Sequence, residues 1–431
     1  MGINSEVILS LSDLSTFNAS ASAEFLFNAL REISLDDIGI TRESYGSSED
    51  TALNLIKTVA EHHGLQTERD DAANLFVSLQ GTATDGSFVL CGSHLDSVPR
   101  GGNYDGAAGV VAGLICLCKM KSLGLVPRKT IKLVALRGEE SAWFGKPCLG
   151  SSALLGQLCA EDLLLKHCVT GKTLLDSMKQ AGAKVDRIRS SCPLIDPKRI
   201  AAYFELHIEQ GPVLAKDGYP VAIVSAIRGN IRHTHVTCNG EAGHSGVVPR
   251  SLRHDAVLAT ADLIMRIDNR WEEMLKSNSD LVVTIGIINT NAADHAITRI
   301  PGEVTFSLDI RSQREEDLET FYRHLQTECL QVEAEKGVSF CFDHQSRSRP
   351  VVLDAHWVEQ LGILARKLGV YAPVIPSGAG HDAAVFAGLG IPTAMIFVRN
   401  ENGSHNPHES MEIADFLQGT QLLYDALLEA A

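Results

Sequence analysis

The chain has 431 residues, with 38 basic and 53 acidic side chains, a formal net charge of −15 and a pI near 5.5. Hydrophobic residues make up 45% and charged residues 21%, which excludes collagen-like, coiled-coil and disordered chains. The length allows two or three domains. Because the chain is acidic and has no run rich in Lys and Arg, we expect it to bind neither nucleic acid nor an anionic membrane.

The sequence gives no sign of export or membrane insertion. No apolar run reaches the roughly 18 residues that a membrane-spanning helix needs. The N-terminal sequence MGINSEVILSLSD lacks a basic segment followed by an apolar one, so no signal peptide is expected. The ten cysteines are scattered and form no CxxC motif, which is typical of reduced thiols. We therefore expect a cytoplasmic protein.

Buried strands and amphipathic helices alternate along most of the chain. Strands are expected at 87–93, 132–136, 201–208 and 392–398, and helices at 49–62, 109–121, 355–367 and 414–429. Strands that alternate with helices predict an α/β fold, in which a mostly parallel sheet is sandwiched by helices.

The stretch 211–345 has a different order of elements. A strand at 231–238, a helix at 254–269, strands at 280–287 and 303–310, a helix at 314–335 and a strand at 338–343 are expected. This β-α-β-β-α-β order predicts a two-layer α+β unit. We therefore expect a catalytic domain in two parts, 1–210 and 346–431, with an inserted domain at 211–345.

Side chains that suit metal binding follow several of the expected strands. They are His94 and Asp96, Asp105 in the glycine-rich loop GGNYDG, Glu139 and Glu140, His207, and His405. In open α/β sheets, ligands bind beyond the carboxyl ends of the strands, so these groups are expected to meet at one edge. Each motif alone is weak evidence, but imidazoles and carboxylates at several strand ends are costly to bury without a shared partner.

Histidine and carboxylate groups without cysteine suit a hydrolytic site with two divalent ions. Two such cations, about 3.5–4 Å apart, repel each other, so a carboxylate must bridge them. Asp105 is the expected bridge, because the glycines beside it let the backbone approach closely. One of Glu139 and Glu140 would bind a metal and the other would serve as general base. Asp96 would hold the imidazole of His94 in one tautomer.

Several segments resemble, in order, motifs of the hydantoinase/carbamoylase branch of the dinuclear aminoacylase-type metallohydrolases. They are GSHLDSVPRGGNYDG, RGEESAWFG, ELHIEQGPVL, GEAGHSGVVPRSLRHDA, IPGEVTFSLDIR, SGAGHDA and GSHNPHE. That branch includes N-carbamoyl-L-amino-acid hydrolases, β-ureidopropionases and allantoate amidohydrolases. ELHIEQGP is the most specific segment, because related peptidases and aminoacylases usually have Glu where this chain has His207.

The resemblance implies two divalent metal ions per subunit, either Zn²⁺ or Mn²⁺, with Co²⁺ or Ni²⁺ as alternatives. The implied ligands are His94, Asp105 and His207 for one ion, and Asp105, Glu140 and His405 for the other. Glu139 would take a proton from water and pass it to the leaving nitrogen.

The resemblance also implies contacts to a small anionic substrate derived from an amino acid. Arg311 would clamp the substrate carboxylate, a role that suits bidentate geometry. His244 would stabilise the oxyanion from the inserted domain. The other implied substrate contacts are Gln210, Asn230, Thr298, Gly380 and His381. A homodimer through the inserted domain is also implied.

Three positions depart from the family pattern. Thr298 stands where Asn is usual, Arg250 where Met is usual, and Trp143 where Arg is usual. An added cation and an added aromatic ring would alter the pocket; alternatively, Arg250 starts a surface helix and Trp143 belongs to the core. The substrate stays open between an N-carbamoyl-L-amino acid, an allantoate- or ureidoglycolate-type compound and an N-acyl amino acid.

The expected activity is therefore metal-dependent hydrolysis of a C–N bond in a linear N-carbamoyl-L-amino acid or a related compound. The alternative from another class is an inactive metal-binding homologue, but no ligand or base is missing from the motifs to favour it. A serine hydrolase is not expected, because the sequence has no G-x-S-x-G motif.

Overall fold

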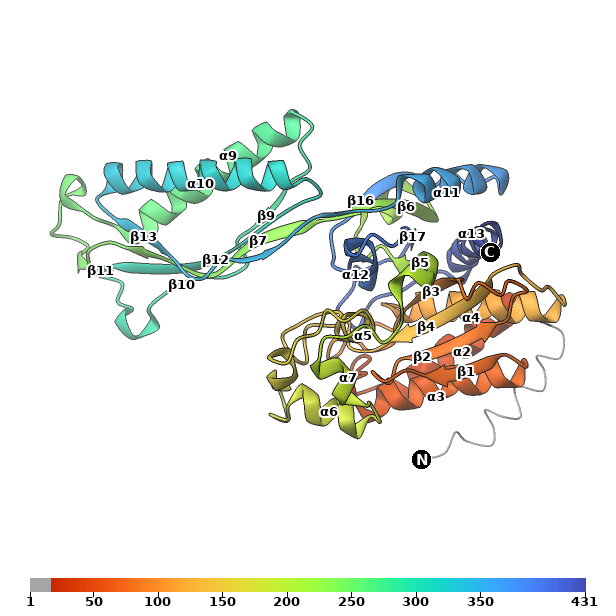
Figure 1. The fold of residues 1–431 in the computed structure, drawn as a ribbon. Helices are drawn as coiled ribbons and strands as arrows, with labels where there is room; N and C mark the ends of the chain where they lie inside the picture. The colour runs from red at the N-terminus through yellow and green to blue at the C-terminus, as the bar shows by residue number, and fades with distance from the viewer. Residues whose placement is uncertain (1–16) are drawn as a thin grey trace. The chain divides into compact units, whose positions relative to one another are not determined.

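The computed structural model describes residues 17–431, which fold into two compact units (Figure 1). The larger unit runs up to Ser225 and resumes at Leu353, and the smaller unit is Ala226–Val352. The sequence places an inserted domain at 211–345; the smaller unit starts later because the strand before it pairs within the sheet of the larger unit. The segment MGINSEVILSLSD, with the expectation that it holds no signal peptide, lies outside the described residues.

A nine-stranded sheet organises the larger unit, in the order β1-β2-β4-β3-β5-β17-β6-β15, with β16 beside β6. The strands are β1 (Gln66–Arg69), β2 (Leu75–Leu79), β3 (Phe88–His94), β4 (Thr130–Leu136), β5 (Ile200–Ile208), β6 (Val221–Ile227), β15 (Val351–Val352), β16 (Val374–Ser377) and β17 (Thr393–Val398). The central strands β4, β3, β5 and β17 are parallel, which confirms the expected fold class. The pairings of β1, β2, β6 and β15 are antiparallel.

Helices cover both faces of this sheet. The helices on one face are α2 (Ala19–Ser34), α3 (Ser47–His62), α4 (Ala107–Ser122), α11 (Ala355–Lys367) and α13 (Ile413–Ala430), and they share one apolar core with alternate strand residues. The other helices are α5 (Leu149–Leu154), α6 (Leu174–Gln180), α7 (Val185–Arg189), α8 (Val213–Asp217) and α12 (Asp382–Gly388). On the opposite face, Phe386 of α12 stacks on Tyr203 of β5 with ring centroids 3.8 Å apart.

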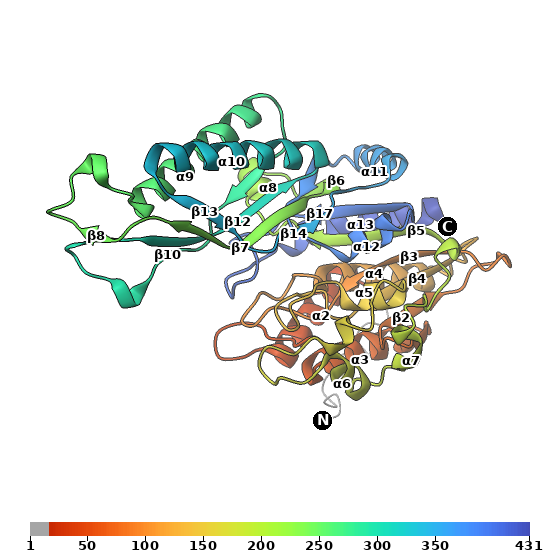
Figure 2. The ribbon, with the colours of Figure 1, turned by 60° about the vertical axis from the view of Figure 1, so that its left-hand side comes forward.

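The smaller unit has a six-stranded antiparallel sheet in the order β10-β12-β7-β13, with β14 beside β7 and β9 beside β12. Its elements are β7 (Gly229–Asn239), β8 (Gly243–His244), α9 (Ala256–Lys276), β9 (Val282–Thr284), β10 (Ile288–Thr290), β11 (Arg299–Ile300), β12 (Glu303–Ser312), α10 (Glu315–Lys336), β13 (Ser339–Phe342) and β14 (Ser346–Ser348). Figures 1 and 2 show α9 and α10 side by side on one face of this sheet. Leu263 and Phe321 from the helices share a core with Ile231 and Phe306 from the strands.

Local sequence explains where these elements begin and which face they bury. Asp255 caps α9 by accepting the backbone N–H groups of Val257 and Leu258, and Asp354 caps α11 in the same way. Along β12, buried residues alternate with less buried ones, as expected for a strand with helices on one face only. In contrast, every residue of β3 is buried, because both faces of the central sheet are covered.

The helices and the cysteines bear on two further expectations from the sequence. Among residues 17–431, no helix combines the length and the apolar character that a membrane crossing requires. All ten cysteines are free thiols, and most of them are buried.

A buried ion pair lies behind the loop that follows β4. The side chains of Arg137 and Glu49 are fully buried, with Nη2 and Oε2 2.6 Å apart. Arg137 Nη1 also lies 2.8 Å from Asp50 Oδ1, and Glu49 accepts the backbone N–H of Gly138 at 3.3 Å. The pair therefore joins the first turn of α3 to the loop after β4.

We expect Glu49→Ala to lower the free energy of unfolding by about 3–5 kcal/mol, because it leaves the guanidinium of Arg137 buried without its nearest carboxylate. Glu68→Ala is the matched control: Glu68 lies 3.0 Å from Lys132, but its side chain is 63% exposed. An exposed pair of this kind contributes about 0–1 kcal/mol. Urea denaturation followed by circular dichroism measures both variants, and equal losses would contradict the prediction.

Candidate metal centre

The fold brings the expected metal ligands together at the carboxyl ends of the central parallel strands. β3 ends at His94, and the neighbouring parallel strand β5 carries His207 one residue before its end. Asp105 lies in the loop before α4, followed by Gly106 at φ +66°. A Cβ on Gly106 would lie 2.4 Å from the ring of His94, so glycine is required for the loop to approach this imidazole.

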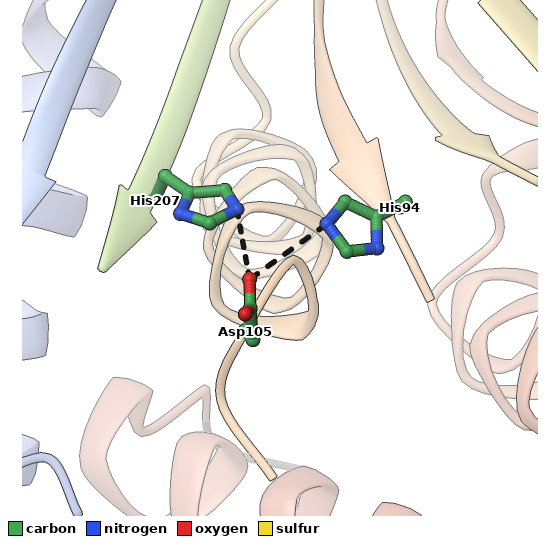
Figure 3. Close-up of side chains that lie close together, drawn as sticks. All are labelled: His94, Asp105 and His207. Carbon is green, nitrogen blue, oxygen red and sulfur yellow. Dashed lines mark ion pairs between the residues drawn. The ribbon is translucent and has the colours of Figure 1, made fainter. Parts of the chain in front are cut away.

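The two carboxylate oxygens of Asp105 face different groups of side chains. Figure 3 shows His94 and His207 turned toward one oxygen, with their Nε2 atoms 3.9 and 3.2 Å from Oδ1. The other oxygen, Oδ2, lies 3.3 Å from Nε2 of His405, which also lies 3.3 Å from Oε1 of Glu140. Two groups with metal-ligand spacing therefore share Asp105: His94–Asp105–His207 and Asp105–Glu140–His405.

The hydrogen bonds of the buried imidazoles test whether this centre fits metal ions. Nδ1 of His94 lies 3.0 Å from the backbone oxygen of Asp96, and Nδ1 of His207 lies 2.9 Å from that of Ile208. A carbonyl oxygen only accepts, so both Nδ1 atoms donate, and each neutral ring turns an unprotonated Nε2 toward Asp105. Lone pairs that face a carboxylate need a cation between them, so the donor set fits divalent metal ions.

Protons and metal ions compete for this centre. When Nε2 of His207 and of His405 carries a proton, each donates to Asp105, and these hydrogen bonds hold the pKa of Asp105 well below its ordinary value against the effect of burial. The hydrogen bonds to Asp105 and Glu140 raise the pKa of His405 to about 10. Ligands must lose their protons to bind a metal, so binding releases protons and weakens as the solution becomes more acidic.

Asp96 joins the loop after β3 to the loop after β4. Its fully buried Oδ1 lies 3.3 Å from Nδ1 of His94 and accepts the backbone N–H of Glu139 at 3.0 Å. Oδ2 accepts the N–H of Glu140 at 3.1 Å and the hydroxyl of Ser44 at 2.6 Å. One carboxylate therefore sets the position of the glutamate pair relative to His94.

Glu139 lies beside the group formed by His94, Asp105 and His207. Its Oε2 is 3.8 Å from Nε2 of His94, and its Oε1 is 3.5 Å from the thiol of Cys148. Burial raises the pKa of Glu139 well above its ordinary value, opposed by His94 and assisted by Glu140. A buried carboxyl group with a raised pKa holds a proton more readily than an exposed one, which suits general acid–base chemistry.

Further polar groups hold Asp105 in place. The hydroxyl of Ser404 and Nε2 of Gln210 lie 2.6 and 2.7 Å from Asp105 Oδ2. Glu409 accepts the backbone N–H groups of Tyr104 at 2.8 Å and Asp105 at 3.2 Å. Gln210, expected at the substrate, therefore contacts the carboxylate of Asp105, while its Oε1 is buried without a hydrogen-bond partner. Sequence reasoning missed Ser404, because a lone serine beside a histidine carries no ligand signature.

His381 packs against the metal centre from the loop before α12. Its ring meets that of His207 edge-on with centroids 4.5 Å apart, and its Nε2 lies 2.8 Å from the hydroxyl of Ser377. Burial, aided by the charge of His207, lowers the pKa of His381 well below its ordinary value. Glu205, His207 and His381 also have metal-ligand spacing. However, Nε2 of His207 already faces Asp105. The third group therefore lines the candidate metal centre and does not form a separate metal site.

Gly380 and two of the other expected substrate residues lie outside the ligand groups. Gly380 precedes His381, and no atom lies within 4 Å of the position where its Cβ would be. In the smaller unit, Asn230 of β7 and Arg311 of β12 are direct partners across the sheet, so their side chains share one face. The guanidinium of Arg311 lies 2.8 Å from Asp309.

His244 and Thr298 are also brought together within the smaller unit. β8 pairs with β11, and the backbone oxygen of Thr298 accepts the N–H of Ser245 at 2.8 Å. Nδ1 of His244 accepts the N–H of Gly246 at 3.1 Å. In the neutral ring the proton then resides on Nε2, which is available to donate a hydrogen bond.

The other two departures from the family pattern have different surroundings. Trp143 is 4% exposed, stacks on His167 with ring centroids 5.3 Å apart, and donates Nε1–H to the backbone oxygen of Ser97 at 2.8 Å. Trp143 therefore belongs to the apolar core, which was one of the two interpretations of this residue from the sequence. Arg250 is exposed in a short helical turn of the smaller unit.

Comparisons with known proteins agree with this site. Residues 90–429 match the model of the peptidase family M20/M25/M40. Over 395 residues the chain is 36% identical to an N-carbamoyl-L-amino acid amidohydrolase of Geobacillus stearothermophilus, covering 91% of this chain and 94% of that one. It is 33% identical over 395 residues to an allantoate amidohydrolase of Escherichia coli strain K12, covering 91% and 93%.

A solved structure extends this likeness to the fold. The crystal structure of a hydantoinase/carbamoylase family amidase from Burkholderia ambifaria matches with a TM-score of 0.85 and 28% identity over 98% of each chain. The resemblance noted in the motifs is thus confirmed over nearly the whole length. The chain belongs to the peptidase family M20/M25/M40 and, within it, to the hydantoinase/carbamoylase branch.

Proposed function

We propose that this protein is a dinuclear metal-dependent amidohydrolase that cleaves the C–N bond of a linear N-carbamoyl-L-amino acid or a related N-substituted amino acid. The observation that carries the proposal is the division of Asp105, whose two oxygens face two separate ligand groups. Family membership and relatives that act on N-carbamoyl amino acids and allantoate support the same reaction class.

Two divalent ions, either Zn²⁺ or Mn²⁺, with Co²⁺ or Ni²⁺ as alternatives, are the proposed cofactors. The proposed ligands are His94, Asp105 and His207 for one ion, and Asp105, Glu140 and His405 for the other. Bound there, the ions supply positive charge that polarises the scissile carbonyl group and activates water.

The remaining chemistry is assigned to the chain's own side chains. Glu139 accepts a proton from the attacking water and delivers it to the leaving nitrogen, for which its buried carboxyl group is suited. His244 donates its Nε2–H to the oxyanion that develops on the substrate. Arg311 and Asn230, which share one face of the smaller sheet, bind the substrate carboxylate and its neighbouring polar atoms.

We further propose that the unit Ala226–Val352 is an inserted lid and dimerisation domain, and that the enzyme is a homodimer. Its substrate-binding residues support the first role, since His244, Thr298, Asn230 and Arg311 all lie in this unit. The ten free cysteines support a reducing compartment, which we propose is the cytoplasm.

The first test measures ammonia release from N-carbamoyl-L-amino acids, N-carbamoyl-β-alanine and allantoate by protein reconstituted with Zn²⁺ or Mn²⁺. We expect turnover of at least one compound and its loss after EDTA treatment, because the ions activate the water. Restored turnover after metal is added back is the control for damage by the chelator. If none of the compounds releases ammonia although two metals are bound, the proposal would change to hydrolysis of an N-acyl amino acid or to an inactive metal-binding homologue.

The adjacent glutamates give a second test, since they are proposed to have different roles. Glu139→Gln should lower kcat by about 10²–10⁴-fold while both metals stay bound, because only proton transfer is removed. Glu140→Gln should lose metal as well as activity, because a ligand of one ion is removed. Metal content per chain and kcat separate the two outcomes, and loss of metal in both variants would argue against a base role for Glu139.

Arg311 provides a test of substrate recognition. We expect Arg311→Met to raise KM about 10–100-fold for substrates with a carboxylate, because charged hydrogen bonds contribute about 1.5–3 kcal/mol. The effect should be much smaller for the amide analogue of the same substrate, which lacks the negative charge. Arg347→Met is the control, since Arg347 pairs with Glu315 and Glu319 on α10. An equal rise for both substrates would place Arg311 away from the carboxylate.

A further inference from the structure

The two largest fully buried side chains in the described part of the protein are those of Arg42 and Arg137. Arg137 has Glu49 and Asp50 as close carboxylate partners. Arg42 has none: within residues 17–431, no carboxylate lies within 4.0 Å of its guanidinium, and its Nη2 has no hydrogen-bond partner. A buried cation without an ion pair is costly, so its contacts call for a specific explanation.

The guanidinium of Arg42 touches the loop between β3 and α4 near both of its ends. Its Nε donates to the backbone oxygen of Leu95 at 2.5 Å, and Leu95 lies between His94 and Asp96. Its Nη1 lies 3.4 Å from Oδ1 of Asn103, two residues before Asp105. One side chain thus contacts the loop after β3 at its start and again just before the bridging carboxylate.

The backbone beside Arg42 is fixed to the same loop. The N–H of Arg42 donates to the hydroxyl of Ser97 at 2.9 Å, and the N–H of Ser97 donates to the oxygen of Arg42 at 2.9 Å. Ile40 and Gly101 exchange two further backbone hydrogen bonds. The segment around Arg42 therefore lies along this loop and is joined to it by hydrogen bonds of its backbone. The guanidinium extends from the segment toward Leu95 and Asn103.

Charge explains why the guanidinium is tolerated there. Burial lowers the pKa of Arg42 to about 10, opposed by the carboxylates of Asp96, Glu409, Asp105 and Glu49, in that order. None of these carboxylates touches Arg42, so they reduce the cost of its charge without fixing its position. The guanidinium is positioned by the backbone oxygen of Leu95, the amide oxygen of Asn103 and the hydroxyl of Ser34, the last two both 3.4 Å from Nη1.

We propose that Arg42 is a positioning residue for metal binding: it holds the start of the β3–α4 loop, beside His94 and Asp96, to the end of the same loop, beside Asp105, so that the ligands are in place before the ions arrive. This inference rests on the proposed metal-dependent function. Lysine cannot replace it, because a single ammonium group lacks the planar fork that donates in two directions.

The test is a competition titration of the full-length protein with Zn²⁺ against a chromophoric chelator at one fixed pH. The variants are Arg42→Lys, which keeps the charge but loses the fork, and Arg42→Met, which loses both. Arg199→Met is the matched control, because exposed Arg199 also donates Nε–H to a backbone oxygen, that of Gly86 at 2.7 Å. Circular dichroism establishes that each variant is folded.

We expect both Arg42 variants to bind Zn²⁺ about 10–100-fold more weakly, as observed when residues that orient metal ligands are removed. Turnover should recover when Zn²⁺ is raised to saturation, because the proposed ligands and Glu139 are unchanged in these variants. Arg199→Met should bind as the wild type does. Asn103→Ala removes one contact of Arg42, together with the hydrogen bond from Asn103 to the backbone oxygen of Phe27 at 2.8 Å, but keeps the buried cation, and should weaken Zn²⁺ binding in the same direction.

A folded Arg42→Lys with wild-type Zn²⁺ affinity overturns the inference. If the Arg42 variants do not fold, Asn103→Ala decides: unchanged affinity overturns the inference and weaker binding supports it. A wild-type chain that binds no Zn²⁺ overturns the proposed function and this inference together. A wild-type chain that binds two ions but hydrolyses no substrate overturns only the proposed function, because the affinities of the variants still test the role of Arg42.

Discussion

The carboxylate of Asp105, turned at once toward two groups of ligands, is the constraint on which the rest of the site depends. A buried carboxylate shared in this way must be held on both oxygens, or it would rotate toward one group and leave the other incomplete. The backbone N–H groups beside it donate to Glu409, while Ser404 and Gln210 contact Oδ2. The parallel pairing of β3 and β5 supplies the histidines that face Oδ1. Glycine at 106 is the local consequence, because any larger residue would collide with the ring of His94.

The need to hold the candidate ligands in place explains why so many polar groups outside the two ligand groups are buried around the centre. Asp96 accepts the N–H groups of both Glu139 and Glu140. The position of the loop that carries these glutamates therefore depends on the position of the loop that follows His94. Arg137 holds that loop from behind through Glu49. Each of these carboxylates is costly to bury alone, and each is satisfied by hydrogen bonds that also fix a ligand-bearing loop. Stability and ligand placement therefore arise from the same contacts.

The sequence predicted the central strands and the ligand-bearing loops because their signals are local. An apolar run followed at once by histidine or carboxylate marks the end of a buried strand, as at His94 and His207. β6 was not expected, because the run Val221–Ile227 falls in the stretch 211–345, whose first expected strand begins only at 231. The contacts of Arg42 and Ser404 were equally invisible, since their partners lie 53 and 299 residues away in the chain. Such roles depend on tertiary packing, which the hydrophobic periodicity of the sequence does not reveal.

Two of the three departures from the family pattern, Trp143 and Thr298, differ in their location. Trp143 is enclosed by the core of the larger unit, so its size is explained by packing and needs no substrate. Thr298 is exposed beside His244, and its backbone oxygen, not its side chain, maintains the pairing of β8 and β11. A side chain at 298 is therefore free to vary without disturbing the strands that carry His244. Under the proposed function, substrate preference would then be set by exposed residues of the smaller unit, while the candidate metal centre is fixed by buried contacts in the larger unit.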